Sequence, residues 1–283
     1  MKILILGAGR IGSTLAFHFS KAGHEVTVVA RGDRLRALQR DGAVRTVDDR
    51  AAPVTAVAAL EPGLAVDLVI VTVPEYQFAP LLPALAASAA RTVLLMFNSF
   101  VDPAVYREAL GGERVALGFP NMLAFLEDQR VRFNVDGPGM IVTVSRPDLR
   151  TLFAEAGLRC KVELDMPAFL RSHAAMVVPL FVAGLWTCER PSALTWAESR
   201  RLAAAWTEGF ALVRRLGHPL RPGVVAALGG FPRWLAVLGM WAFSRSASVR
   251  DVGKFGPEET RWLIDRMVEA KGGPMPHLLA IRP

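Results

Sequence analysis

Three glycines near the start of the chain have the spacing G-x-G-x-x-G. They are Gly7, Gly9 and Gly12 of the stretch ILGAGRIGS, and a short apolar run precedes them. Between a strand and a helix, this spacing allows a tight turn, a close approach of a pyrophosphate to the backbone, and close packing of the helix on the strand. The pattern predicts a dinucleotide-binding turn that also includes Arg10 and Ile11, although an ordinary glycine-rich turn has the same spacing.

The second expected strand, residues 25–30, is followed directly by Arg31. An acid at this position would accept hydrogen bonds from the ribose hydroxyls of NAD and would repel a 2′-phosphate. An arginine has the opposite preference because its guanidinium can bind a phosphate through two hydrogen bonds, and Arg34 is close enough along the chain to assist. The predicted cofactor is therefore NADP(H). The alternative is an exposed arginine at a strand end.

Strand and helix patterns alternate up to about residue 165. Apolar runs expected to form strands are residues 2–6, 25–30, 67–73, 92–97, 115–119, 140–144 and 158–164. Helical patterns separate several of these runs, and Asp33 is the expected N-cap of the second helix. The alternation predicts an α/β fold of Rossmann type with a doubly wound parallel sheet. From Pro167 onward apolar residues recur at helical spacing. We therefore expect a dinucleotide-binding domain at 1–166 and an all-helical C-terminal domain at 167–283.

Composition limits the classes of partner. Hydrophobic residues make up 52% of the chain, and the two cysteines fit neither a metal knuckle nor a redox pair. We therefore expect no metal and a reducing, cytoplasmic compartment. Residues 1–167 hold 18 lysines and arginines against 18 acids, whereas residues 168–283 hold 15 against 8. The whole positive excess lies in the second part, which favours a small anionic ligand. No basic run is interleaved with aromatic residues, so nucleic acid is not expected.

One apolar stretch, residues 224–243, has nearly the length of a membrane span. Gly229, Gly230, Pro232 and Arg233 lie at its middle, where a charge and a broken helix are costly in lipid. The stretch predicts two short buried helices and no membrane segment. An exposed apolar face there is an alternative that would serve a homodimer interface.

The chain resembles the ketopantoate reductases (2-dehydropantoate 2-reductases) over nearly its whole length. The resemblance rests on ILGAGRIGS, HEVTVVARGDRLRALQRDG, DLVIVTVPEYQ and VLLMFNSFVD, and more loosely on SASVRDVGKFGPEETRWLID. It implies an NADPH-binding Rossmann domain, a helical C-terminal domain and reduction of a small 2-oxo acid. It also implies cofactor contacts at Val73, Pro74 and Asn98. Pro74 stands where the family commonly has a lysine. An alternative role for Asn98 is that of a turn former before Ser99.

The family's catalytic lysine near the start of the helical domain is absent, because no lysine lies between Lys161 and Lys254. The corresponding stretch, MPAFLRSHAAMVVPL, offers Arg171 and His173 as ionisable candidates. On a helix they point about 200° apart. We expect His173 to donate the proton, with a pKa near 6.5 unless the site shifts it, and Arg171 to anchor a carboxylate or lie at the surface. The alternative for His173 is a hydrogen-bonded histidine on an apolar helix.

Toward the C-terminus, the resemblance implies that Glu259 contacts the hydroxyl end of the substrate and that Ser246 binds its carboxylate. Alternatively, Glu258 and Glu259 are acids in a first helical turn, where they interact favourably with the helix dipole. The expected function is NADPH-dependent reduction of a small 2-oxo acid, with His173, Glu259 and Asn98 as catalytic residues. Two alternatives remain open: a reductase of a more apolar carbonyl or imine, and an NADP(H)-binding protein without catalysis.

Overall fold

The computed structural model describes residues 1–61, 63–190, 192–246, 248–253, 256–270 and 273–283. The chain divides into two compact units. One consists of Met1–Phe97 and Pro103–Met166, and the other of Asn98–Asp102 and Pro167–Pro283. The second unit thus begins at Pro167, and it also includes a short segment that the sequence analysis placed in the first domain.

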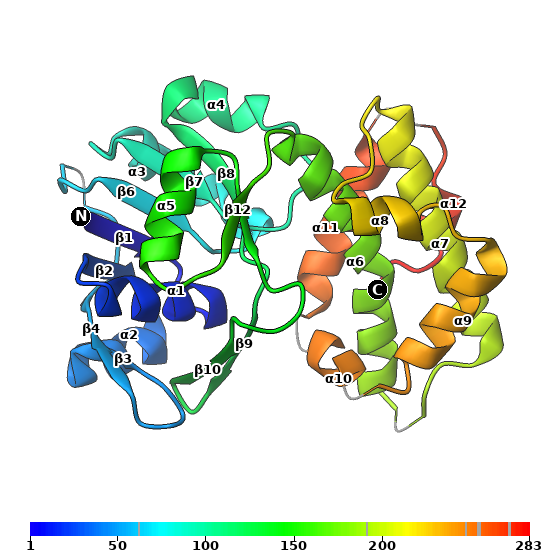
Figure 1. The fold of residues 1–283 in the computed structure, drawn as a ribbon, viewed down its shortest axis with the longest axis horizontal. Helices are drawn as coiled ribbons and strands as arrows, with labels where there is room; N and C mark the ends of the chain where they lie inside the picture. The colour runs from blue at the N-terminus through cyan, green and yellow to red at the C-terminus, as the bar shows by residue number, and fades with distance from the viewer. Residues whose placement is uncertain (62, 191, 247, 254–255, 271–272) are drawn as a thin grey trace. The chain divides into compact units, whose positions relative to one another are not determined.

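An eight-stranded sheet forms the centre of the first unit (Figure 1). Along the sheet the strands are β12 (Cys160–Val162), β11 (Val142–Val144), β8 (Val115–Phe119), β7 (Thr92–Leu95), β6 (Leu68–Val71), β1 (Lys2–Leu6), β2 (Glu25–Val29) and β5 (Thr55–Val57). All seven apolar runs named above contain one of these strands, so the predicted α/β class and sheet are confirmed. The sheet is parallel from β5 to β8, but β11 pairs antiparallel with β8 and parallel with β12. The predicted parallel sheet therefore includes one antiparallel pair, between β11 and β8.

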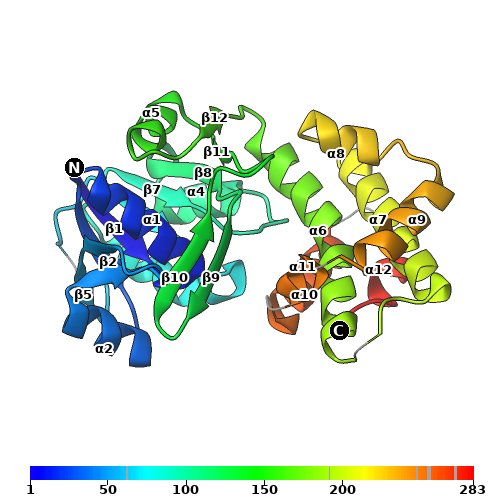
Figure 2. The same cartoon turned by 60° about the horizontal axis from the view of Figure 1, so that its bottom comes forward.

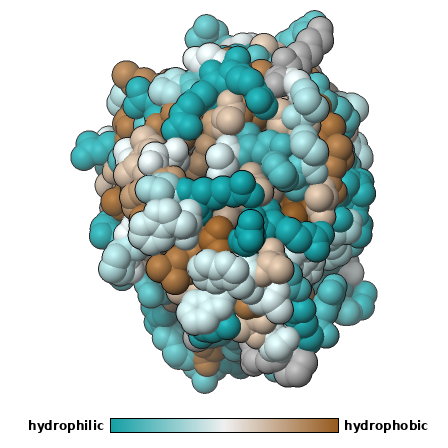
Figure 3. Space-filling view, turned by 90° about the vertical axis from the view of Figure 1, so that its right-hand side faces the viewer, coloured by the Kyte–Doolittle hydropathy of each residue, from teal (hydrophilic) through white to brown (hydrophobic). Residues whose placement is uncertain are grey.

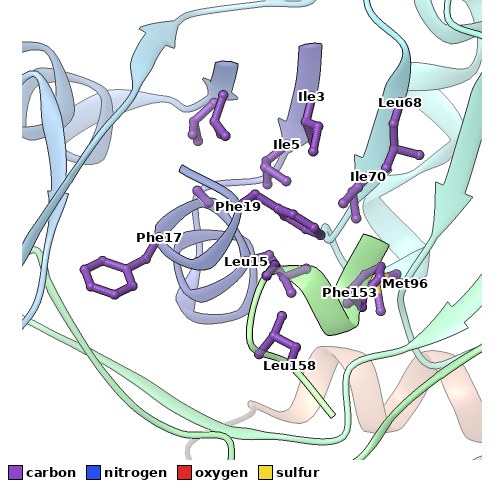
Figure 4. Close-up of a cluster of buried hydrophobic side chains, with 14 of the residues drawn as sticks. Ile3, Ile5, Leu15, Phe17, Phe19, Leu68, Ile70, Met96, Phe153 and Leu158 are labelled. Atoms are coloured by element: carbon purple, nitrogen blue, oxygen red, sulfur yellow. The ribbon is translucent and has the colours of Figure 1, made fainter. Parts of the chain in front are cut away.

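Helices cover both faces of this sheet. They are α1 (Arg10–Lys21), α2 (Gly32–Asp41), α3 (Leu82–Ala86), α4 (Ala104–Leu110) and α5 (Pro147–Glu155), with 3₁₀ turns at Glu75–Gln77, Ala79–Leu81 and Gly112–Arg114. Figure 4 shows Leu15 and Phe19 of α1 beside Ile5 of β1 and Phe153 of α5, in the apolar cluster on one face. Because the strands are buried on both faces, their sequences are continuous apolar runs.

Two short ribbons accompany the sheet. One pairs β3 (Ala43–Arg45) with β4 (Ala51–Pro53), and the other is the hairpin of β9 (Leu123–Glu127) and β10 (Arg130–Asn134), which contacts α1 (Figure 2). Asp128 and Gln129 join β9 to β10, and both have positive φ angles, of 45° and 65°. Such a two-residue turn matches the twist of a hairpin. This hairpin was not predicted, because its turn lacks the usual glycine.

The second unit is helical, as predicted. Its helices are α6 (Met166–Cys188), α7 (Trp196–Arg215), α8 (Gly223–Leu228), α9 (Arg233–Phe243), α10 (Ser248–Gly253), α11 (Pro257–Glu269) and α12 (Pro276–Leu279). A capping box between Thr195 and Glu198 fixes the start of α7. Within the described residues, α6 is the one helix long and apolar enough to cross a membrane, and 78% of its most apolar window is buried inside the protein. We therefore interpret α6 as the core helix of this unit.

The stretch 224–243 forms the two expected short helices, α8 and α9, which meet around Gly229–Pro232. Their burial was overestimated. Val225, Val237 and Met240 are buried, whereas Val224 and Trp234 are 65% and 64% exposed. Each helix packs one side on the unit, and the other side faces solvent. Figure 3 shows the surface of the helical unit, where apolar side chains are interspersed with hydrophilic ones.

Candidate functional site

The glycine-rich turn lies where two neighbouring strands of the first unit end. β1 leads into Gly7 and β6 leads into Thr72, and the two strands are paired in parallel. The chain leaves β1 toward β2 on one side and returns to β6 on the other, so this is the point where an open sheet of this kind binds its ligand. The Thr72 hydroxyl donates a hydrogen bond to the Gly7 carbonyl at 2.9 Å and thereby closes the turn.

Each glycine of the turn meets a different steric condition. Gly7 has a φ of 115°, and a Cβ there would lie 2.9 Å from Cγ1 of Val73. At Gly12 a Cβ would lie 1.8 Å from the Gly7 carbonyl oxygen, so the first turn of α1 can pack on the loop only because Gly12 has no side chain. At Gly9 a Cβ would meet no atom within 4 Å. The open space in front of Gly9 lets a phosphate approach the backbone, so the turn fits a dinucleotide.

Arg31 lies at the end of β2 and is the N-cap residue of α2, with extended backbone angles. Its side chain is exposed, and its guanidinium makes no hydrogen bond or ion pair with the described residues. It is thus available for an anion at the strand end. Asp33, the expected N-cap, lies inside the first turn of α2, so that expectation is wrong by two residues.

Arg34 has a different environment, although it lies on the same helix. Its Nε donates to the Ala8 carbonyl at 3.1 Å, its Nη2 donates to Ser13 Oγ at 2.8 Å, and its Nη1 donates to the Gln129 carbonyl. Burial lowers the pKa of this guanidinium from its ordinary value, and an arginine remains protonated nevertheless. The sequence did not indicate these contacts, because Gln129 is distant along the chain.

Val73 and Pro74 follow β6 on the other side of the turn, and both are partly buried. Directly after them, the buried carboxylate of Glu75 accepts a hydrogen bond from the Tyr106 hydroxyl at 2.6 Å. Phe78 and Phe97 pack against the Tyr106 ring. This polar pair at a strand end was missed, since Glu75 and Tyr106 lie on separate elements and neither belongs to a motif.

Asn98 and Glu259, predicted from separate parts of the sequence, meet in the second unit. Asn98 Nδ2 donates to Glu259 Oε1 at 2.8 Å. Glu259 lies in the first turn of α11, the position on which its alternative role at the helix dipole depends, and Glu258 beside it is exposed. Asn98 Oδ1 is buried and accepts no hydrogen bond from the described residues. A buried acceptor of this kind is usually satisfied, so the atom fits an N–H or O–H donor of a ligand.

Arg171 is a buried cation on α6. Its side chain is only 9% exposed, whereas that of Asp102, at 3.8 Å, is 70% exposed. The distance between Arg171 Nη2 and Asp102 Oδ2 is too long for a hydrogen bond, so the ion pair is loose. Asp102 and Asn98 belong to the same short segment of the helical unit. This segment therefore contributes to both polar contacts.

His173 is two residues further along α6. Its ring stacks on that of Phe169, with the centroids 6.3 Å apart. Burial lowers the pKa of His173 to about 4. The site therefore shifts this pKa well below its ordinary value of 6.5, and the imidazole is neutral at pH 7. A neutral imidazole donates a hydrogen bond from one nitrogen but is a poor proton donor, so the remaining candidate sources of a proton are Glu259 in its protonated form and a water held by Asn98.

The low pKa of His173 predicts a loss of stability in acid. Between pH 6.5 and pH 4 the unfolded chain binds a proton that the folded chain does not, so the free energy of unfolding decreases as the pH falls. For this partly exposed ring we expect about 1 kcal/mol between pH 6.5 and pH 5. Urea unfolding of the wild type and of His173→Phe at both pH values measures it. An equal loss of stability in the two proteins would contradict the assignment.

Ser246 lies after α9 and is exposed, and its hydroxyl donates to the Phe243 carbonyl at 2.7 Å. Its predicted contact with a carboxylate remains a prediction. Ala247, in the middle of the SASVRD stretch, lies outside the described residues. In the described part of the chain no three His, Cys, Asp or Glu residues gather as metal ligands.

A parallel sheet with a glycine-rich turn at the ends of β1 and β6 defines a Rossmann-type dinucleotide-binding fold. The helical unit contains the contact between Asn98 and Glu259 and the buried Arg171. This chain belongs to the ketopantoate reductase PanE/ApbA family, whose family model matches residues 3–145. The family consists of oxidoreductases that act on CH–OH and C=O groups.

Solved structures show the same fold over the whole chain. A PanE/ApbA family ketopantoate reductase from Ralstonia eutropha JMP134 has a TM-score of 0.75 and 20% identity, over 100% of this chain and 96% of that one. The 2-dehydropantoate 2-reductase of Porphyromonas gingivalis W83 has a TM-score of 0.72 and 16% identity, over 99% and 97%. D-mandelate dehydrogenase in ternary complex with NADH and anilino(oxo)acetate has a TM-score of 0.75 and 16% identity, over 100% and 96%.

A curated protein with local similarity is the Trk system potassium uptake protein TrkA of Halomonas elongata. It is 50% identical over 48 residues, which are 17% of this chain. The match spans 10% of the length of that protein. It therefore concerns a short segment and carries no conclusion about the activity of the whole chain.

Proposed function

We propose that this protein is an NADPH-dependent reductase of a small 2-oxo acid. The observation that carries this proposal is the contact of Asn98 with Glu259, which joins a residue following β7 to the first turn of α11. Each of these residues was predicted as catalytic through the resemblance to the family. The family, whose members act on CH–OH and C=O groups, supports the same reaction class.

The first unit would hold the cofactor. Gly9 leaves space for the pyrophosphate, Gly12 allows α1 to direct its N-terminus at it, and Arg31 would bind the 2′-phosphate. Bound NADPH supplies a hydride to the carbonyl carbon of the substrate. The remaining demand on the protein is a hydrogen-bond or proton donor for the carbonyl oxygen, which becomes negatively charged as the hydride arrives.

The second unit would bind the substrate. The guanidinium of Arg171 keeps its charge at any working pH and is mostly removed from water, so a carboxylate would be a favourable partner for it. Glu259 would hold the Asn98 amide in place, and Asn98 Oδ1 would accept a hydrogen bond from the bound molecule. The positive excess of residues 168–283 is consistent with an anionic substrate.

A second substrate class also has support. D-mandelate dehydrogenase, a structural neighbour, was solved with anilino(oxo)acetate, an oxoacetate that carries an aromatic anilino group. This chain lacks a lysine between Lys161 and Lys254 and has Pro74 at the position of another family lysine. A bulkier and more apolar 2-oxo acid than ketopantoate is therefore the second candidate. The absent lysines also favour an NADP(H)-binding protein without catalysis.

We propose a cytoplasmic location on the basis of two free cysteines, Cys160 and Cys188.

The exposed apolar side chains of α8 and α9, among them Val224 and Trp234, would form a homodimer interface. Sedimentation of the purified protein at several concentrations tests this interface, and a monomer at all of them would overturn it.

Arg31→Ala is expected to remove the preference for NADPH. The 2′-phosphate of NADPH would lose a charge-assisted pair of hydrogen bonds. The affinity for NADPH should therefore fall by about tenfold to a hundredfold, whereas the affinity for NADH should change little. Fluorescence titration with both coenzymes measures the ratio. Arg36→Ala is a matched control, because Arg36 is exposed on the same helix and pairs with Asp33. Tighter binding of NADH by the wild type, or an unchanged ratio in Arg31→Ala, would count against NADP(H).

A further inference from the structure

We propose that Arg34 is a positioning residue that holds the glycine-rich turn in its binding conformation, and that it does not bind the 2′-phosphate itself. The proposal rests on the dinucleotide binding proposed above. It differs from the prediction made from the sequence, in which Arg34 assisted Arg31 at the phosphate.

The contacts of Arg34 lead to this assignment. The Ala8 carbonyl, between Gly7 and Gly9, accepts hydrogen bonds from Arg34 Nε at 3.1 Å and from Ser13 Oγ at 3.0 Å. Ser13 Oγ in turn accepts from Arg34 Nη2 at 2.8 Å. The three groups form a closed network around one peptide of the turn. Ala8 and Ser13 are both buried, so water cannot replace these hydrogen bonds without cost.

Arg34 also connects this turn to the β9–β10 hairpin. Its Nη1 donates to the carbonyl of Gln129, one of the two hairpin residues with positive φ. A guanidinium is planar and has donors in three directions, so one side chain can serve three acceptors on three segments. The network therefore ties the glycine-rich turn, the first turns of α1 and the hairpin together within the first unit.

The geometry separates the roles of the two arginines. Arg31 is exposed and makes no side-chain hydrogen bond with the described residues, whereas Arg34 is partly buried and directs Nε, Nη1 and Nη2 at protein acceptors. A turn held in one conformation presents its backbone N–H groups to a pyrophosphate with less ordering on binding. The pyrophosphate is common to NADPH and NADH. Arg34 should therefore contribute equally to the affinity for both, and Arg31 to NADPH alone.

The experiment measures the dissociation constants of NADPH and NADH for the wild type, Arg34→Ala, Arg34→Lys and Arg31→Ala, with Arg36→Ala as the control. We expect Arg34→Ala to weaken both coenzymes by about tenfold or more, with their ratio unchanged within about twofold. Arg34→Lys should behave like Arg34→Ala, because an ammonium group cannot donate hydrogen bonds to all three acceptors. The lysine would still attract a phosphate through its positive charge. Selective loss of NADPH in Arg34→Ala, rescued by lysine, would overturn the proposal.

A second measurement needs no coenzyme. Limited trypsin digestion of the free protein reports on the hairpin through cleavage after Arg130 and Arg132. Cleavage there should be faster in Arg34→Ala and Arg34→Lys than in the wild type, and unchanged in Arg31→Ala and Arg36→Ala. Equal rates in all five proteins would overturn the role of Arg34. If the wild type binds neither coenzyme but the cleavage rates differ as expected, the proposed function fails and the positioning role stands.

Discussion

Replacing Gly12 with alanine is expected to destabilise the first unit and to abolish NADPH binding. The new Cβ would lie 1.8 Å from the Gly7 carbonyl oxygen and 2.6 Å from Thr72 Oγ1, so α1 must move away from the turn. Overpacking in a well-packed core costs about 1–3 kcal/mol and occasionally more, and we expect the upper end here because the clash is with backbone. Thermal unfolding and NADPH titration measure the two effects.

Gly9→Ala is the matched variant in the same turn. Its Cβ would meet no protein atom within 4 Å, and its φ of −70° suits any residue. We expect the stability of Gly9→Ala to equal that of the wild type, while NADPH affinity falls by about tenfold or more because the methyl group occupies the space for the pyrophosphate. Wild-type affinity in Gly9→Ala would show that the cofactor does not approach this backbone.

Glu259→Gln is expected to lower the rate of NADPH-dependent reduction by a factor of about 10² to 10⁴, the range for loss of a positioned acid or base. Glutamine has nearly the same shape and can still accept from Asn98 Nδ2, so the fold should be retained, whereas the carboxylate is lost. NADPH affinity should not change, since the glycine-rich turn belongs to the other unit. Steady-state kinetics with the best substrate gives kcat and KM separately.

Glu258→Gln is the control for that experiment, because Glu258 is the adjacent acid in the same helical turn and is exposed. If both acids only interacted with the dipole of helix α11, the two substitutions would have equal, small effects on stability and no effect on turnover. Turnover of Glu259→Gln within a few-fold of the wild type would remove Glu259 from the catalytic residues.

The sequence predicted the sheet of the first unit because its strands are buried on both faces and are therefore apolar throughout. It also predicted the turn from the spacing of Gly7, Gly9 and Gly12, because a side chain would clash at Gly7 and Gly12 and would occupy the space for the pyrophosphate at Gly9. The antiparallel pairing of β11 with β8 could not be predicted, since a buried strand has the same pattern in either direction. The β9–β10 hairpin was missed because Asp128 and Gln129 take positive φ angles without a glycine.

The candidate site was predicted in part. Asn98 and Glu259 were found through the resemblance, and their contact depends on the fold, since they are far apart in the chain. The fixed position of Arg34 and the buried Glu75–Tyr106 pair could not be read from local patterns, because each depends on partners from other elements. The lowered pKa of His173 could not be predicted, because the sequence does not report how far a side chain on α6 is removed from water.

The missing family lysine has no direct replacement in these contacts. Arg171 supplies a buried positive charge but cannot give up a proton, and His173 is neutral at pH 7. In the proposed reaction, the two tasks of one lysine, attraction of an anion and donation of a proton, would therefore lie on different groups. Arg171 would perform the first, and protonated Glu259 or a water bound to Asn98 the second.

Steady-state oxidation of NADPH, followed at its absorbance band with a panel of 2-oxo acids, tests the central claim most directly. The panel should include ketopantoate and bulkier aromatic 2-oxo acids, each at several concentrations, with Glu259→Gln measured in parallel. We expect saturable oxidation with at least one acid, faster with NADPH than with NADH and strongly reduced in the variant. Tight binding of NADPH without oxidation by any member of the panel would contradict the reductase assignment and support a protein that binds the cofactor without turnover.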